Sequence, residues 1–377
     1  MGRSIKMAES PMEGHPDKLA DLIADALLDE FIRKDPYSRV SLEILLISGM
    51  TLVAGHVSTE SYVDIPGAVR QTIKEVGYSR AEYGFDADSS AVLTSIEEQS
   101  PDIVLGISSE GAGDTATVVG YACTDTENYM PMPISLAHRI SQRVSDLRKS
   151  GKAPFLRPDG KVLITVLYED EKPVFVKDAI IFCQHDPDIS LEKLRDFVME
   201  EAVKKIIPQN LIQKETRILV NPSGRFVLGG PAADAGQTGR KIVSDAYGDV
   251  AYSGGSAFSG KDPTKTDRTA SYLARMMAKH VVASGLAQRC MLQMAYAFGL
   301  SEVIAFDIET YGTEKVEKER IKSRLLEVFP TNPKRMMEFL DLRKPIYKQT
   351  ACYGHFGKEN LPWEKLTKLE ALLELKQ

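Results

Sequence analysis

The sequence predicts an α+β fold of more than one domain, and three observations support this. The chain has 377 residues, more than a single hydrophobic core usually organises. Hydrophobic residues make up 43% and charged residues 27%, which is typical of a soluble protein that folds throughout. Strand-like and helix-like segments alternate along the chain, and each unit mixes strands with about two helices, as in domains built around sheets.

The first unit begins with an amphipathic helix. Apolar residues recur at spacing four between Pro16 and Lys34, which predicts a helix with one buried face. The proline stands in the first turn, where it is tolerated. A second helix is expected over residues 65–76, and residues 91–96 form either a short helix or a strand.

Two β-rich runs, 39–47 and 51–59, lie between these helices and predict a hairpin. Gly49 is the residue in the connection that can adopt unusual backbone angles. A turn with two central residues would place Glu43 opposite His56.

Later segments repeat this mixture of elements. A glycine-rich stretch from Gly106 to Gly113 predicts a mobile loop near a domain boundary. Strands are expected over 115–123, 162–168, 174–183, 291–298 and 302–311. Helices are expected over 190–207, 267–283 and 315–328. The resulting division is an N-terminal domain of residues 1–102, a central domain of 108–229 and a C-terminal domain of 230–377.

Composition also limits the class of protein. The net charge of −6 argues against a general nucleic-acid or membrane-surface binder, so any phosphate site must be local. The four cysteines are far apart and form no CxxC pair, which fits neither a disulfide framework nor a zinc site. No segment approaches the ~18 apolar residues of a membrane span. We therefore expect a cytoplasmic protein.

One candidate anion site lies at the start of the first helix. The segment 14–18 reads GHPDK and places His15, Asp17 and Lys18 where exposed backbone N–H groups favour anions. A purely structural interpretation is also open, in which Asp17 complements the helix dipole and His15 caps the helix.

A denser cluster lies between residues 240 and 267. Arg240 and Lys241 precede a glycine-rich run, 255–261, that satisfies the pattern GxxxxGK. A Walker motif would continue with Ser or Thr, whereas here Asp and Pro follow, which disfavours a P-loop NTPase. Glycines let a backbone approach a ligand, and closely spaced Lys and Arg neutralise phosphate oxygens. We therefore favour a ligand site over a solvated charged face.

Seven motifs resemble the signatures of methionine adenosyltransferases, in that family's order. They are GHPDK at 14–18, GAGD at 111–114, FLRPDGK at 155–161, NPSGRFVLGGP at 221–231, DAGQTGRK at 234–241, AFSGKDPTKTDR at 257–268 and YGHFG at 353–357. The resemblance runs from about Ala8 to Trp363. It implies three similar α/β domains related by pseudo-threefold symmetry. It also implies a homodimer or dimer of dimers, with active sites at the subunit interface.

The resemblance implies ATP and methionine as substrates, two magnesium ions per site and a potassium ion. His15 would lie beside the ATP 5′ carbon and the triphosphate. Asp17 and Asp267 would each hold a magnesium ion, and Glu43 would be the potassium ligand.

Further positions match residues that surround the reactants in the family. Those around the nucleotide are Asp114, Asp159, Lys161, Arg225, Phe226, Asp234, Ala257 and Lys261. Arg240 and Lys241 match the triphosphate clamp. Asp234 and Lys265 match residues that hold the amino and carboxylate groups of methionine.

The chemistry of the reactants explains this set. A thioether sulfur has no proton to lose, so its attack on the 5′ carbon needs no general base. The departing tripolyphosphate carries several negative charges, and preorganised cations aimed at it are the largest catalytic lever. Lys161, Arg240, Lys241 and Lys261 would supply them, together with magnesium.

The sequence departs from the family near the amino-acid pocket. His56 stands where the family usually has a glutamate that contacts methionine, and Leu105 stands where it has a glutamine. Neutral drift in an active methionine enzyme is the leading interpretation, with His56 paired to Glu43 across the hairpin. The alternatives are a paralogue that adenosylates a different sulfur nucleophile, and a non-catalytic partner subunit.

Overall fold

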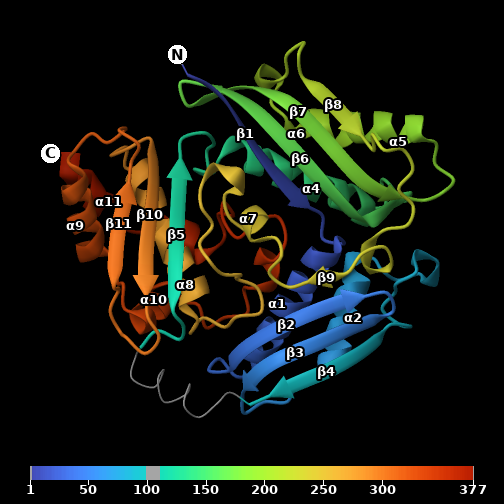
Figure 1. The fold of residues 1–377 in the computed structure, drawn as a ribbon, viewed down its shortest axis with the longest axis horizontal. Coiled ribbons are helices and arrows are strands. Elements are labelled where there is room, and N and C mark those ends of the chain that lie inside the picture. Colours follow the sequence, from blue (N-terminus) through green and yellow to red (C-terminus); the bar gives the residue numbers. More distant parts are fainter. Residues whose placement is uncertain (1, 99–110, 377) are drawn as a thin grey trace.

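The computed structural model describes residues 2–98 and 111–376. Within this part of the chain, three β-sheets surround a group of helices (Figure 1). Their strand orders are β4-β3-β2-β9, β1-β6-β7-β8 and β11-β10-β5. The mixture of sheets and helices confirms the predicted α+β class.

A common succession of strand, helix, hairpin and helix recurs three times along the chain. The first copy comprises β1 (Arg3–Pro11), α1 (Pro16–Lys34), β2 (Arg39–Ile47), β3 (Met50–Ser58), α2 (Ile65–Val76) and β4 (Ala91–Glu97). The second comprises β5 (Ala116–Cys123), α4 (Met132–Lys149), β6 (Leu156–Glu169), β7 (Lys172–His185), α5 (Leu191–Val198), α6 (Lys204–Ile206) and β8 (Arg217–Val220). A π-helical turn, Met199–Val203, joins α5 to α6.

The third copy is longer and ends in additional helices. It comprises β9 (Gly236–Gln237), α7 (Ile242–Asp245), α8 (Thr266–Ala283), β10 (Arg289–Tyr296), β11 (Ala305–Glu309), α9 (Lys318–Val328), α10 (Pro333–Phe339) and α11 (Leu369–Leu373).

The first strand of each copy pairs with the sheet of another copy. Strand β1 pairs antiparallel with β6, β5 with β10, and β9 with β2. In each case the partner is the first strand of a hairpin. The exchange is therefore cyclic, as the predicted pseudo-threefold arrangement requires. The domain boundaries near residues 102–108 and 229–230 stay predictions.

Helix α1 lies at the centre of the molecule. His15 is its N-cap and Pro16 opens its first turn, where the fixed backbone angle of proline suits a helix. Sixteen of its 19 residues are buried, so it is enclosed on nearly all sides. The predicted bounds, Pro16 to Lys34, are confirmed.

The hairpin register differs from the prediction. Ser48 and Gly49 are the central residues of the turn, so Ile47 pairs with Met50. Gly49 adopts a φ of 75°, which glycine permits without strain. Glu43 consequently lies opposite Ala54, and the predicted pairing of Glu43 with His56 is wrong.

Residues 91–97 form strand β4, which pairs in parallel with β3. The predicted loop at 106–113 and Leu105 lie outside the described residues, except for Gly111 to Gly113. The expected elements did not include β1, β8 or α4.

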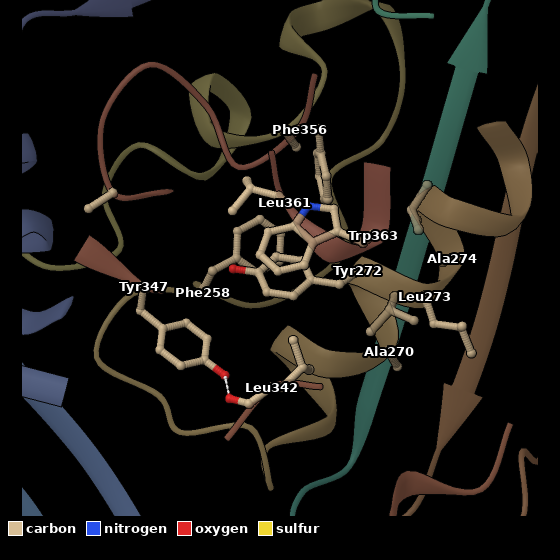
Figure 2. Packing of buried hydrophobic residues seen from close by; sticks show 14 of the residues in the cluster. Phe258, Ala270, Tyr272, Leu273, Ala274, Leu342, Tyr347, Phe356, Leu361 and Trp363 are labelled. Atoms are coloured by element: carbon tan, nitrogen blue, oxygen red, sulfur yellow. Dashed lines mark hydrogen bonds between the residues drawn. The ribbon is translucent and has the colours of Figure 1, made fainter. Parts of the chain in front are cut away.

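The buried hydrophobic side chains form two clusters. The larger cluster spans the first and third copies together with strand β5 of the second copy, while the sheet that contains β6 and β7 packs with its helices in the other. Figure 2 shows the aromatic part of the larger cluster, where Tyr272 stacks on Trp363 with ring centroids 3.7 Å apart.

No helix among the described residues combines the length and apolarity needed to cross a bilayer.

Candidate active site

The loop before α1 lies directly against strand β6. A Cβ built on Gly14 would lie 2.4 Å from the Cβ of Pro158, so only glycine allows this approach. The hydroxyl of Tyr78 donates to the carbonyl of Gly14 at 2.6 Å. These contacts bring the GHPDK loop beside the segment that carries Asp159 and Lys161.

Asp17 is the centre of a first group of charged residues. Its carboxylate is buried and accepts hydrogen bonds from the Gln237 N–H at 3.0 Å and the Lys241 ammonium at 2.6 Å. The Arg240 guanidinium lies 3.6 Å away. Burial would raise the pKa of Asp17, but the hydrogen bonds from Lys241 and Gln237 outweigh it and hold the pKa below its usual value. Asp17 is therefore an anion at neutral pH.

His15 faces the same cations. Its Nδ1 accepts a hydrogen bond from the Asp17 N–H at 3.2 Å. Burial lowers the pKa of His15 to about 3, with further lowering by the nearby Lys241 and Lys161. The imidazole is therefore neutral throughout the physiological range.

We predict that His15 contributes no acidic limb to the pH profile of kcat between pH 5 and 8. The unfolded chain takes up this proton near pH 6.5 while the native chain does not, so His15 lowers stability progressively as the pH falls below 6.5. NMR titration of ¹⁵N-histidine-labelled protein measures this, with the resonance assigned by its loss in His15→Gln. A midpoint near 6.5 for His15 would contradict the prediction.

Asp159 and Lys161 project from β6 beside this group. Asp159 is buried and accepts a hydrogen bond from the Gly230 N–H at 2.8 Å. Burial raises the pKa of Asp159 to about 6. Lys161 is half-buried and pairs with Glu9 of β1 at 3.1 Å. The exchanged strand β1 thus contributes directly to the surroundings of the site.

A second group forms around Lys261, in the loop before α8 (Thr266–Ala283). The Lys261 ammonium lies 2.6 Å from the Asp267 carboxylate, which is buried. The backbone carbonyl of Asp114 accepts from the Thr266 hydroxyl at 3.2 Å, and the Asp114 side chain is exposed. Residues from the second and third copies of the repeat therefore meet here.

Glu43 is the neighbour of this second group on strand β2. Ser41, two residues earlier, forms an isolated β-bridge with Lys261. Partial desolvation raises the pKa of Glu43, although its side chain is exposed on one side, and the nearby Lys261 opposes the rise.

The remaining nucleotide positions are spread over nearby loops. Arg225 is exposed, and the backbone of half-buried Phe226 exchanges two hydrogen bonds with His185. Asp234 is exposed and close enough to Asp159 to raise its pKa.

Ala257 connects the two groups of charges. A Cβ built on Gly239 would lie 2.7 Å from the Ala257 Cβ. The loop that carries Arg240 and Lys241 therefore touches the loop that leads to Lys261.

Two of the residues predicted to hold methionine have protein neighbours in the structure. Lys265 is buried and pairs with Asp262 at 2.7 Å. His56 is exposed on β3, where it lies opposite Ser41 and beside Glu97 of β4. Their role in methionine binding stays a prediction.

The GxxxxGK pattern is not a P-loop. Residues 251–260 contain no strand, and α8 begins at Thr266, five residues after Lys261. Gly260 has a φ of 82° and packs on the carbonyl of Leu42. The segment therefore lacks the strand-to-helix geometry of a Walker motif.

A row of buried aspartates beside the candidate site was not predicted from the sequence. Asp21, Asp25 and Asp29 follow Asp17 at spacing four, and all are buried on α1. Buried carboxylates require partners. Acidic residues that recur at helical spacing within an otherwise apolar helix could therefore have indicated buried contacts of this kind.

Comparison with known proteins identifies the family. Models of the S-adenosylmethionine synthetase N-terminal, central and C-terminal domains match residues 3–101, 109–226 and 228–365. The chain is 64% identical over 372 residues to an S-adenosylmethionine synthase of Aquifex aeolicus, covering 99% of both chains. It is 50% identical to one of Desulforudis audaxviator, covering 99% of this chain and 98% of that one, and 49% identical to one of Thermus thermophilus, covering 97% and 96%. The chain therefore belongs to the S-adenosylmethionine synthetase family.

Proposed function

We propose that this protein transfers the adenosyl group of ATP to the sulfur of methionine, giving S-adenosylmethionine, pyrophosphate and phosphate. The observation that carries the proposal is the pairing of cations with the two acids expected to bind magnesium, Lys241 with Asp17 and Lys261 with Asp267. A triphosphate with its counter-ions can replace each partner without leaving a charge unpaired. Relatives named S-adenosylmethionine synthase cover nearly the whole chain, so a different nucleophile or a non-catalytic role is not favoured.

The reaction is a displacement at carbon. A sulfur lone pair of methionine forms the new S–C5′ bond as the C5′–O bond breaks, and the electron pair leaves with tripolyphosphate. The sulfonium product carries a positive charge, and no proton moves in this step. Lys161, Arg240, Lys241 and Lys261 stabilise the charge that develops on the leaving group. His15 is neutral and adds a polar contact without adding a charge.

The same cations serve the second step. Tripolyphosphate remains bound after adenosyl transfer, and hydrolysis to pyrophosphate and phosphate precedes release. Both steps place negative charge on phosphate oxygens, so one preorganised set of cations lowers both barriers.

The residues present fit two magnesium ions. Magnesium is usually bound by one or two carboxylates together with substrate phosphates and water. Asp17 and Asp267 are single buried carboxylates, each beside a lysine that we expect to bind phosphate. No cluster of three or more acidic, histidine or cysteine side chains placed for a metal occurs in residues 2–98 or 111–376. Bound magnesium would neutralise phosphate charge. Glu43 offers one carboxylate to a potassium ion.

We further propose that a second copy of the chain covers the outer face of the first sheet. Alternate residues on neighbouring strands leave that face apolar and incompletely buried: Leu45, Ile47, Met50, Leu52 and Leu93. Helix α1 packs against β2, where the alternate residues are buried.

Glu43 and His56 share this outer face by strand alternation. A homodimer or dimer of dimers would therefore bring site residues to the interface, together with ATP and methionine. Light scattering of the purified protein tests this, and a monomer with full activity would overturn it.

The decisive experiment follows the bridging oxygen of ATP. We expect ¹⁸O between C5′ and the α-phosphorus to remain with the triphosphate-derived products when Mg-ATP and methionine are supplied. Mass spectrometry of phosphate, pyrophosphate and S-adenosylmethionine measures this, with methionine omitted as the control. ADP or AMP as the first product would contradict adenosyl transfer.

A further inference from the structure

Four aspartates form a regular row along α1. Asp17, Asp21, Asp25 and Asp29 recur at every fourth residue, and each is at most 6% exposed. Residues four apart lie on one side of a helix. Every carboxylate in the row accepts a hydrogen bond from a backbone N–H of the third repeat. The helix therefore presents evenly spaced anchors to loops that are more than 200 residues away in sequence.

Asp21 anchors the loop that carries the triphosphate clamp. Its Oδ1 accepts from the Gly239 N–H at 2.8 Å, and its Oδ2 accepts from the buried Lys18 ammonium at 2.7 Å. Gly239 has a φ of 80° and directly precedes Arg240. The carboxylate thus fixes the backbone directly before Arg240 and Lys241, the two cations of the triphosphate clamp.

Asp25 anchors the loop that carries Lys261. Its Oδ1 accepts from the Gly260 N–H at 2.9 Å. The same carboxylate forms a two-pronged pair with Arg268 at 2.8 Å for both bonds. Arg268 also donates to the Lys261 carbonyl at 3.0 Å. The backbone is therefore held on both sides of the Gly260–Lys261 peptide.

Asp29 has the same kind of contacts but serves a different segment. It accepts from the N–H groups of Tyr347 and Lys348, each at 2.9 Å. Neither residue belongs to the proposed site. Asp29 is thus a matched structural counterpart within the same row.

We propose that Asp21 and Asp25 are positioning residues that hold the Arg240–Lys241 loop and the Lys261 loop at a fixed separation. Successive anchors are about 6 Å apart along α1, because four residues rise about 1.5 Å each. Two cationic loops tied to consecutive anchors cannot drift apart without breaking a buried hydrogen bond. The inference rests on the proposed function, in which both loops act on one triphosphate.

Amide substitutions along the row test the proposal. Asp21→Asn is expected to lower kcat by about 10-fold to 100-fold and to weaken tripolyphosphate binding by at least about 10-fold, because displaced cations stabilise the leaving group less. Asp29→Asn is the control and should leave both quantities within about twofold while lowering the melting temperature. Assays run at a temperature where both variants are fully folded by circular dichroism.

Asp21→Glu provides a second variant in case the amide fails to fold. It keeps the charge beside Lys18 but moves the carboxylate by one methylene, so a purely electrostatic role predicts normal kcat and a positioning role predicts a loss. Asp25→Asn should behave as Asp21→Asn does. Equal kcat for the Asp21 and Asp29 variants, with wild-type protein active, would overturn the inference. Inactive wild-type protein would instead count against the proposed function.

Discussion

Replacing Lys261 by alanine is expected to lower turnover by at least about 10²-fold. Its ammonium lies 2.6 Å from Asp267 and is only 18% exposed, so it is held in place before the substrate arrives. Removing one preorganised donor from a charge-stabilising site costs about 10²-fold to 10³-fold in other enzymes. Steady-state kcat with Mg-ATP and methionine measures the effect.

Two further variants make this result specific to the position. Lys204→Ala removes an exposed lysine paired with Glu200 and should leave kcat within twofold, because exposed pairs contribute little. Lys261→Arg restores the positive charge and should recover part of the lost rate. Unchanged turnover in Lys261→Ala would show that this cluster is a solvated face. Thermal melting is measured alongside, since Asp267 loses its partner.

The local elements with strong periodicity were predictable from sequence. The bounds of α1, β2 and α2 agree with the predicted ranges, because apolar spacing, a first-turn proline and flanking turn residues all favour the same assignment there. The hairpin connection was also predicted, but the strand register differs from the predicted one, because Ser48 is one of the two central residues of the turn. A local sequence pattern therefore predicts the position of a turn more reliably than the register of the two strands that the turn connects.

Two of the elements that were not predicted, α4 and β1, have patterns of polar and apolar residues that do not match their burial. Helix α4 buries Ser135, His138, Ser141 and Ser145, residues that a hydrophobic pattern assigns to the surface. Strand β1 has the opposite problem, since its larger apolar residues, such as Ile5 at 43%, are exposed. Burial in both cases follows from long-range packing.

The cyclic exchange of strands lies beyond any local signal. Residues of strand β1 pair with residues of β6 that lie at least 150 positions later, and the two-residue β9 has no periodicity to detect. The motifs indicated the candidate site residues, and the structure brings Arg240 and Lys241 to Asp17, and Lys261 to Asp267. It could not be inferred from them that Lys265 is buried against Asp262, because both residues stand in a segment that resembles an exposed charged loop.

Replacing Arg275 by methionine is expected to destabilise the fold by about 3–5 kcal/mol. The guanidinium is fully buried and forms two hydrogen bonds of 3.0 Å with Glu364. It also donates to the carbonyls of Tyr121, Asn128 and Tyr129. Removing one partner of a buried ion pair is costly because the other charge stays buried. Here the Glu364 carboxylate and the three carbonyl oxygens all lose the donor that Arg275 provides.

The fluorescence of the chain's single tryptophan reports on the surroundings of Arg275. Trp363 precedes Glu364 and stacks on Tyr272, which lies on the same helix as Arg275 (Figure 2). Urea denaturation followed by Trp363 fluorescence should therefore show an earlier transition in Arg275→Met. Arg217→Met is the control, because Arg217 is 63% exposed in its pair with Asp178 and should cost at most about 1 kcal/mol. Lys279 still pairs with Glu364 at 2.9 Å. If that contact alone neutralises the carboxylate, the two variants will unfold at the same urea concentration, and the large expected loss will be wrong.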